Sequence, residues 1–434
     1  MSFAAPLLLL LAILRTPLFV VIALSAMLGF HSQEVDLSVI SIEIYRLAEM
    51  PVMIAIPLFT FAGYLLGEGH ASTRLVNLSN SLLGWMPGGL AIVAIFSCAL
   101  FTAFTGASGI TIVALGGLLY PALKEAGYLE NFNLGLITSS GSLGLLFAPS
   151  LPLILYGVVA QQMDLDQPVG ITDLFLAGIF PGLLMLVMLS VYSMLQPRVQ
   201  SQRARFEWPA ALDAIKAAKW EIPLPLLVLG GIYGGYFAVS EAAAVTALYV
   251  LIVEVLIIVL IVEVLIIREI KVSELPNIMR EAMMLVGGIL IIVGVSLAST
   301  NYLIDAEVPT RMFEFVQQHI DEKLTFLIVL NLFLLALGMM LDIFSAIVII
   351  VPIILPIAVG YGIHPVHLGI IFLANMQLGY FTPPVGMNLF IASYRFEKPV
   401  MTLYVATIPF FIVLLISVLI ITYWPTLSLA LLPD

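Results

Sequence analysis

Long apolar runs, separated by short polar segments, fill most of this chain. The runs at 172–195, 283–300 and 402–424 are continuous and approach the roughly 20 apolar residues that a helix needs to cross a bilayer. Other runs are interrupted in the middle by Gly, Ser, Thr or Pro. The pattern predicts an all-α polytopic membrane protein in which several helices are broken.

The clearest break lies within residues 88–124. Two apolar arms of about 14–15 residues meet at the small polar sequence 105–109 (Thr-Gly-Ala-Ser-Gly), and each arm is short of a full span. This predicts a re-entrant hairpin with its tip near the middle of the membrane. A Gly/Ser-rich contact between two packed helices is the alternative. A similar pattern at 325–358, with Asp342 near its centre, favours the hairpin.

Two further runs carry breaks that contain proline. The run 131–161 is interrupted at 139–142 and again at 148–152 (Ala-Pro-Ser-Leu-Pro), and the run 365–395 is interrupted at 382–386 (Thr-Pro-Pro-Val-Gly). Proline removes a backbone donor and blocks the preceding turn. Both segments are therefore predicted to be broken helices with unwound backbone, the alternative being kinks used for packing.

The two halves of the chain align with each other. Residues 105–108 match 342–345, and the spacing of 14 residues from Gly135 to Pro149 returns from Gly369 to Pro383. These landmarks keep their order, which indicates an internal repeat.

Charge gives the predicted orientation. The loop 196–221 is the most basic in the chain and is placed in the cytoplasm, whereas 161–173 is acidic and is placed outside. Counting spans from these loops puts the N-terminus inside and the C-terminus outside. The hairpin at 88–124 then enters from the cytoplasm and the one at 325–358 from outside. Inverted repeats with broken helices at the midplane are typical of secondary transporters.

The predicted domain organisation follows from the repeat. It comprises an N-terminal span with an external loop (1–52), a first repeat (53–161), linking scaffold spans with the basic loop (162–282), a second repeat (283–395) and a last span (396–434). Residues 3–14 are read as part of the first span rather than as a signal peptide, because no positive region precedes them.

Composition excludes several classes of protein. Of 434 residues, 62% are hydrophobic and only 10% are charged, too few to cover a soluble protein of this size. The single Cys98 and the five histidines show no metal-ligand spacing. The absence of a phosphate-binding Gly-Lys motif argues against ATP as the energy source, and nothing suggests a nucleic-acid partner.

The four breaks, at 105–109, 139–152, 338–345 and 375–386, are expected to converge into one site. They supply hydroxyls, side-chain amides and freed carbonyls, the oxygen ligands that suit a small hard cation such as Na⁺. Asp342 is the only carboxylate at a break, and it either ligates a cation, carries a proton, or caps the helix that starts at residue 343.

Some charged residues fall outside these breaks. Arg15, Arg74 and Arg311 are candidates for binding a substrate carboxylate, with interfacial anchoring favoured for the last two. The sequence at 251–258 is repeated at 260–267 and carries Glu254 and its copy into an apolar run. A structural role is predicted for both glutamates.

Three segments resemble one known family. Residues 55–59 (Ala-Ile-Pro-Leu-Phe), 104–109 (Phe-Thr-Gly-Ala-Ser-Gly) and 382–386 followed by Asn388 are similar to the large membrane subunit of TRAP (tripartite ATP-independent periplasmic) transporters. The resemblance implies a Na⁺-coupled importer of an organic acid, of the sialic acid or C4-dicarboxylate class, in the bacterial inner membrane. It also implies an elevator motion and two partners, a small membrane subunit and a periplasmic substrate-binding protein.

The resemblance also assigns candidate site residues. The ion-binding candidates are Thr105, Gly106, Ser108, Gly109, Ser139, Gly141, Asp342, Ser345, Gly379, Thr382 and Gly386. The substrate-binding candidates are Ser140, Asn375, Gln377, Pro383 and Asn388.

Other functions remain as alternatives. A stand-alone ion-coupled carrier of organic anions has the same features without partners. An ion channel and an intramembrane enzyme are less favoured, the enzyme because paired carboxylates are needed for aspartyl chemistry and only Asp342 lies at a break.

Overall fold

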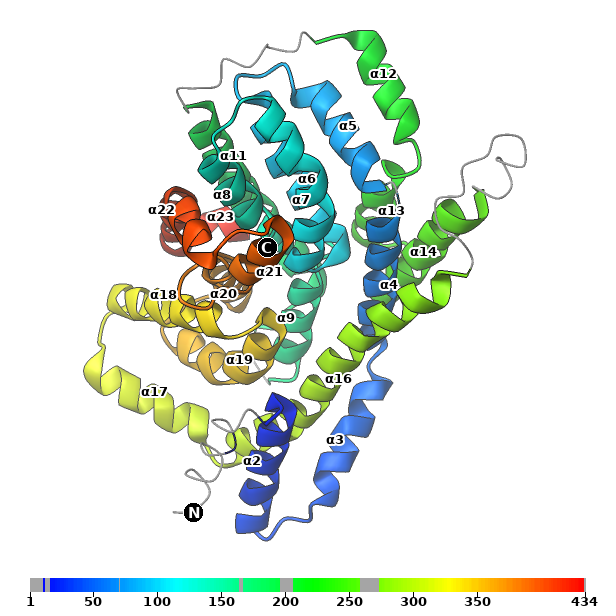
Figure 1. Ribbon diagram of the computed structural model, residues 1–434. Coiled ribbons are helices and arrows are strands. Elements are labelled where there is room, and N and C mark those ends of the chain that lie inside the picture. Colours follow the sequence, from blue (N-terminus) through cyan, green and yellow to red (C-terminus); the bar gives the residue numbers. More distant parts are fainter. Residues whose placement is uncertain are drawn as a thin grey trace.

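The computed structural model describes residues 11, 16–69, 71–163, 167–195, 206–257 and 273–432 (Figure 1). Throughout these ranges the chain forms helices and loops and no β-strand. Six of the helices are long and apolar enough to cross a membrane, or seven if one bent pair counts as a single span. These findings agree with the predicted all-α, multi-pass membrane class.

The helices pack as two groups. A peripheral group contains α2 (Leu18–Ser32), α3 (Ser38–Glu49), α4 (Ala55–Glu68), α13 (Pro223–Tyr233), α14 (Val239–Leu251) and α16 (Leu275–Asp305). A central group contains α6 to α11 and α18 to α23. Figure 1 shows α16 as a long rod that passes between α2 and α4. The first helix of the predicted repeat 53–161, α4, packs on α14 and α16 as well as on α6 of the central group.

The first predicted hairpin consists of α6 (Gly89–Thr105) and α7 (Ser108–Glu125), which pack against each other. Gly106 has a φ of 67°, a left-handed conformation that suits glycine, and it ends α6. The arms have 17 and 18 residues, longer than predicted, because α7 continues through Pro121.

The second predicted hairpin consists of α18 (Lys323–Met340) and α19 (Ile343–Gly360), of 18 residues each. Leu341 and Asp342 join them. Both breaks fall where the sequence places them, and the re-entrant course of the two pairs through a bilayer stays a prediction.

The two broken helices are also interrupted near the expected residues. In the first, α8 (Glu130–Ser140) is followed by the 3-10 turn η2 (Leu143–Leu146) and by α9 (Leu151–Gln161), with a bend of 42°. In the second, α20 (Pro365–Gly379) and α21 (Met387–Phe396) are separated by seven residues of loop, 380–386. The remaining central helices are α10 (Ile171–Ala177), α11 (Ile179–Met194), α22 (Val400–Tyr423) and α23 (Thr426–Leu429).

Several segments differ from the prediction. The region 30–52, expected to be a polar external loop, forms α3 and the short 3-10 helix η1 (Pro51–Ile54), and the basic loop contains α12 (Trp208–Ala217). Pro17 precedes α2 as its N-cap. Two amphipathic helices, α5 (Ala71–Leu83) and α17 (Val308–His319), lie beside the central group.

Some predictions fall on residues outside the described ranges. These are Arg15, His70, most of the basic residues of 196–205 and the second copy of the duplicated sequence, 260–267.

Glycines let each broken helix cross a neighbouring arm closely. A Cβ added at Gly144 in η2 would lie 2.2 Å from the carbonyl oxygen of Ala99 in α6. In the second half, a Cβ at Gly379 would lie 2.4 Å from the carbonyl carbon of Gly338 in α18. Because backbone atoms cannot give way as a flexible side chain does, these crossings fix the breaks against the arms.

Candidate functional site

A cavity of ≈ 580 Å³ lies where the tips of both helix pairs meet the peripheral group. Its wall from the central group is formed by Gly106, Ala107, Ser108, Gly109, Ile110, Val113, Ala114, Leu145, Asp342, Ile343, Phe344, Tyr380, Met387 and Ile391. Its wall from the peripheral group is formed by Tyr64, Gly67 and Glu68 of α4 and by Glu281 and Leu285 of α16.

Four of the predicted site residues line this cavity: Gly106, Ser108, Gly109 and Asp342. The Asp342 side chain is exposed, and its Oδ1 accepts a hydrogen bond of 3.0 Å from the backbone N–H of Ser345. Asp342 is thus the N-cap of α19, which confirms the capping interpretation. Its role toward a cation stays a prediction.

The tip of the first pair is held by the second broken helix. The Ser108 hydroxyl donates to Oδ1 of Asn388 at 2.8 Å, and Nδ2 of Asn388 donates to the carbonyl of Thr138 at 3.2 Å. These buried bonds connect α7, α21 and α8. Asn388 is therefore a structural link between the two repeats, whatever else it binds.

The tip of the second pair is held in a similar way. The backbone N–H of Ile343 donates to the Tyr380 hydroxyl at 2.7 Å, and Tyr380 lines the cavity. Both tips are thus fastened by residues that flank the second break.

Other predicted hydroxyls bond to nearby backbone and do not line the cavity. Thr105 donates to the carbonyl of Ala107 at 3.5 Å, Ser139 to that of Gly135 at 2.8 Å, and Thr382 to that of Leu378 at 2.6 Å. The carbonyl of Gly141 accepts from Thr102 at 2.8 Å. Their oxygens keep lone pairs, but the structure does not direct them into the cavity.

Of the remaining predicted site residues, some are buried and one is exposed. Ser345 is buried in the first turn of α19, and Gly379 forms the crossing with Gly338. Gly386 is buried before α21, whereas Pro383 is exposed.

A second group of predicted residues is buried where the two broken helices meet. Ser142 donates to the carbonyl of Gln377 at 3.4 Å, which brings η2 and α20 together. In the described part of the chain, the Ser140 hydroxyl, Oδ1 of Asn375 and both polar atoms of the Gln377 amide are buried without a hydrogen-bond partner. Buried polar atoms usually have partners, so the oxygen atoms among them are candidates for ion ligation.

Asn331 and Thr422 were not identified from the sequence, although they extend this buried polar group. Oδ1 of Asn331 accepts from Nδ2 of Asn375 at 2.7 Å and from the Thr422 hydroxyl at 3.1 Å. Each is a single polar residue in an apolar run, which is a weak signal.

The sequence interpretation also missed the cavity residues of the peripheral group. Tyr64 and Glu68 are four residues apart on α4, as are Glu281 and Leu285 on α16, so each pair shares a helix face. None of the described residues that line the cavity is Lys, Arg or His. The spacing was readable, but nothing in the sequence shows that these faces meet the helix breaks.

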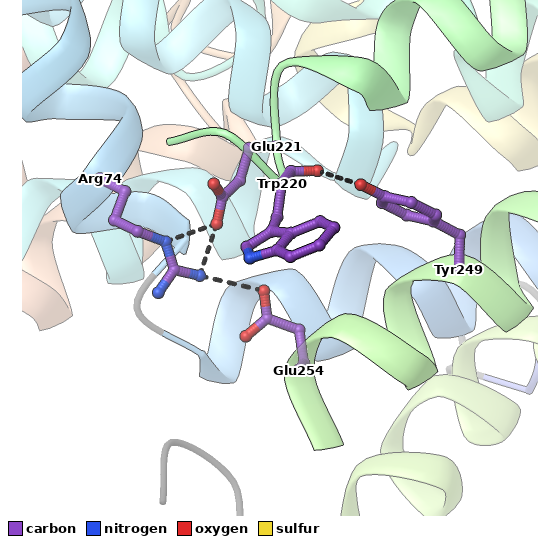
Figure 2. A network of polar contacts seen from close by, with 5 residues as sticks. All are labelled: Arg74, Trp220, Glu221, Tyr249 and Glu254. Atoms are coloured by element: carbon purple, nitrogen blue, oxygen red, sulfur yellow. Dashed lines mark hydrogen bonds and ion pairs between the residues drawn. The ribbon is translucent and has the colours of Figure 1, made fainter. Parts of the chain in front are cut away.

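Arg74 has a different role from the one predicted. Figure 2 shows its guanidinium between Glu221 and Glu254, with Nη2 of Arg74 3.2 Å from Oε1 of Glu254. Both glutamates are buried and Arg74 is largely buried. Arg74 is thus an intramolecular ion-pair partner and not an interfacial anchor, and Glu254 has the structural role predicted for it.

The end of α21 is fastened to the first helix pair. Nζ of Lys398 lies 2.5 Å from Oε1 of Glu130, which also accepts from the Tyr120 hydroxyl at 3.0 Å. The hydrogen bond to Glu130 raises the pKa of Lys398. Nε of Arg395 donates to the carbonyl of Val113 at 2.9 Å. These contacts join the end of α21 and the residue Lys398 after it to α7 and α8.

A membrane protein with paired helix breaks around a cavity of this size has the architecture of a transporter permease. The family model "Tripartite ATP-independent periplasmic transporter, DctM component" matches residues 5–427. The chain therefore belongs to this family and is the large permease subunit of a TRAP transporter.

The names of similar proteins specify different solutes. The isethionate TRAP transporter permease protein DctMQ of Oleidesulfovibrio alaskensis is 33% identical, and the match covers 94% of this chain and 62% of that protein. The C4-dicarboxylate large permease protein DctM of Pseudomonas aeruginosa is 32% identical over 90% of this chain and 88% of the relative. The ectoine large permease protein TeaC of Halomonas elongata is 28% identical over 96% of both chains.

Two solved structures share the fold. The YdaH transporter of Alcanivorax borkumensis aligns with a TM-score of 0.64 at 15% identity, covering 89% of this chain and 87% of that one. MtrF of Neisseria gonorrhoeae aligns with a TM-score of 0.52 at 14% identity, covering 88% and 82%. At these identities the likeness concerns the fold alone.

Proposed function

We propose that this subunit imports an organic acid by Na⁺ symport. A periplasmic binding protein delivers the solute and a small membrane subunit completes the transporter. The observation that carries the proposal is the cavity that joins the tips of both helix pairs, with Asp342 in its wall. A stand-alone carrier is the alternative.

The ion sites are proposed at the breaks. Na⁺ prefers several oxygen ligands, and Asp342 offers a carboxylate oxygen at the cavity. The unpartnered oxygens of Ser140, Asn375 and Gln377 are further, buried candidate ligands. A cation at these positions would satisfy polar atoms whose burial otherwise costs free energy.

The proposed movement uses the two groups of helices. The peripheral group serves as the scaffold, and the central group moves against it as an elevator. The cavity is bordered by the last residues of α4 and the first turns of α16. These ends face the cytoplasm in the proposed orientation, which has the N-terminus inside and the C-terminus in the periplasm. The described conformation is then the inward-facing one.

Uptake into proteoliposomes tests the proposal. The chain is reconstituted with its small subunit and binding protein, and four solutes are offered with and without a Na⁺ gradient. This solute panel consists of succinate, isethionate, ectoine and the sialic acid N-acetylneuraminate. Uptake of one solute that needs the Na⁺ gradient and both partners supports the proposal. Equal uptake without Na⁺ contradicts symport, and equal uptake without the partners favours the stand-alone carrier.

The variant Asp342→Asn isolates the role of the charge. The amide oxygen of asparagine can still cap the Ser345 N–H, so the fold should persist. Loss of the carboxylate should weaken apparent Na⁺ affinity by about 10–100-fold, measured as the Na⁺ concentration that gives half-maximal uptake.

Asp36→Asn is the matched control. The Asp36 carboxylate also accepts a backbone N–H, that of Ser38 at 2.7 Å, a bond that lowers its pKa. Asp36 is exposed and does not line the cavity. If Asp342→Asn keeps the Na⁺ dependence of the Asp36→Asn control, Asp342 is not an ion ligand.

A further inference from the structure

The cavity combines a helix N-terminus without a side-chain cap in its central wall with carboxylates in both walls, since Asp342 also lies in the central wall. In the central wall, residues 106–110 include the break and the first turn of α7. The first N–H groups of a helix have no acceptor within it, and the helix dipole adds positive potential there. The N-cap of α7 is Ala107, and no side chain caps this helix. The amides of α7 are therefore available to an anionic group in the cavity.

The peripheral wall is acidic. Glu68 and Glu281 line it, and both residues are exposed to solvent. No lining residue among those described is basic. These glutamates belong to the scaffold helices, so Na⁺ bound at the breaks of the central group would not be their direct partner. The peripheral wall therefore favours a cationic group and repels a second carboxylate.

Aromatic rings add an independent preference of the same sign. Tyr64, Phe344 and Tyr380 all line the cavity. The face of an aromatic ring attracts ammonium and related nitrogen cations, and this attraction grows when water is excluded. Tyr64 lies on α4 with Glu68, whereas Phe344 and Tyr380 belong to the central wall, so Tyr64 is the ring that adds to the cation preference of the acidic wall.

We propose that the solute is a zwitterion, with a carboxylate that faces the α7 amides and a cationic nitrogen that faces Glu68 and Glu281. This assignment rests on the proposed transport function, because it takes the cavity as the solute site. Within that function, the assignment restricts the transported solute to one kind of charge distribution. A dianion would bring its second carboxylate against the acidic wall, and a monoanion would leave that wall without a partner.

The solute panel tests the assignment, because ectoine alone among the four is a neutral zwitterion. We expect Na⁺-driven uptake of ectoine in preference to the three anionic solutes. The variants Glu68→Gln and Glu281→Gln should each raise the KM for ectoine at least tenfold with a smaller change in maximal rate. Glu281→Asp keeps the charge and should restore most of the affinity, which separates the charge effect from a folding defect.

Glu207→Gln is the matched control, since Glu207 is exposed and does not line the cavity. It should leave the KM for ectoine unchanged. Na⁺-driven uptake of succinate, isethionate or N-acetylneuraminate in preference to ectoine leaves the transport function standing and overturns the zwitterion assignment. So does an unchanged KM in both Glu→Gln variants. Uptake of none of the four contradicts the transport function and the assignment together.

Discussion

The two proline-containing breaks, one in each predicted repeat, lie in different surroundings. The first break is enclosed, with Pro149 and Ser150 buried, whereas Pro383, Pro384 and Val385 of the second break are exposed. The helices that leave the two tips differ too, because α7 has no side-chain cap and α19 is capped by Asp342. A repeated sequence pattern thus builds two breaks, but packing decides which of them is sealed and which is open.

The amphipathic helices of the two repeats show the same contrast. Arg74 of α5 and Arg311 of α17 correspond in the predicted internal repeat, because each precedes its matched break residue, Thr105 or Asp342, by 31 residues. Arg74 is largely buried between Glu221 and Glu254, while Arg311 is exposed and forms no ion pair within the described ranges. α5 is therefore tied to the peripheral group by charge, and α17 has no equivalent tie.

The largest expected effect comes from breaking this tie. Arg74→Met removes an ion-pair partner from two buried carboxylates and should lower the free energy of unfolding by about 3–5 kcal/mol. Thermal unfolding of the purified protein in detergent measures the change. The matched variant Arg311→Met should leave the unfolding temperature nearly unchanged. Equal effects of the two variants would contradict the asymmetry between α5 and α17.

A smaller loss is expected where the two repeats are alike. Gly144→Ala and Gly379→Ala each place a Cβ within 2.4 Å of backbone atoms, so the helix crossing must widen. Such overpacking typically costs about 1–3 kcal/mol. Both should also reduce uptake, because the breaks shift against their arms. Gly287→Ala in α16 is the control, since a Cβ there meets nothing within 4 Å. A tolerated Gly144→Ala with a damaging Gly379→Ala would show that only the second crossing is tight.

The sequence was most informative where local chemistry decides the structure. Glycine at 106, proline at 149 and 383 and the capping carboxylate at 342 each act on their own backbone, so the breaks were predicted at nearly the observed residues. The family resemblance was confirmed by the match to residues 5–427.

The parts that depend on tertiary packing could not be predicted. Glu68 and Glu281 sit on ordinary helix faces, and only the packing of α4 and α16 beside the tips brings them to the cavity. Arg74 and Glu254 are 180 residues apart, and neither sequence neighbourhood indicates the other. The loops around α3 and α12 were misjudged because their amphipathic patterns are short and polar enough to resemble connections.

The smallest expected difference in the free energy of unfolding lies between variants that remove the hydrogen bonds at the two tips. Asn388→Ala removes two buried hydrogen bonds, from Ser108 and to Thr138, and leaves those groups without their partner. The free energy of unfolding should fall by about 2 kcal/mol.

Tyr380→Phe removes only the acceptor of the Ile343 N–H while it keeps the ring, so about 1 kcal/mol is expected. A pair of cysteines placed across each tip contact would measure, through its rate of crosslinking, how loosely that tip is held. We expect Asn388→Ala to loosen the first tip more than Tyr380→Phe loosens the second. If Tyr380→Phe has the greater effect on both measurements, the second helix pair, beside the exposed break, depends more on its tip contact than the first pair, beside the enclosed break, does. The enclosure of the first break, rather than the bonds at its tip, would then be what holds the first helix pair in place.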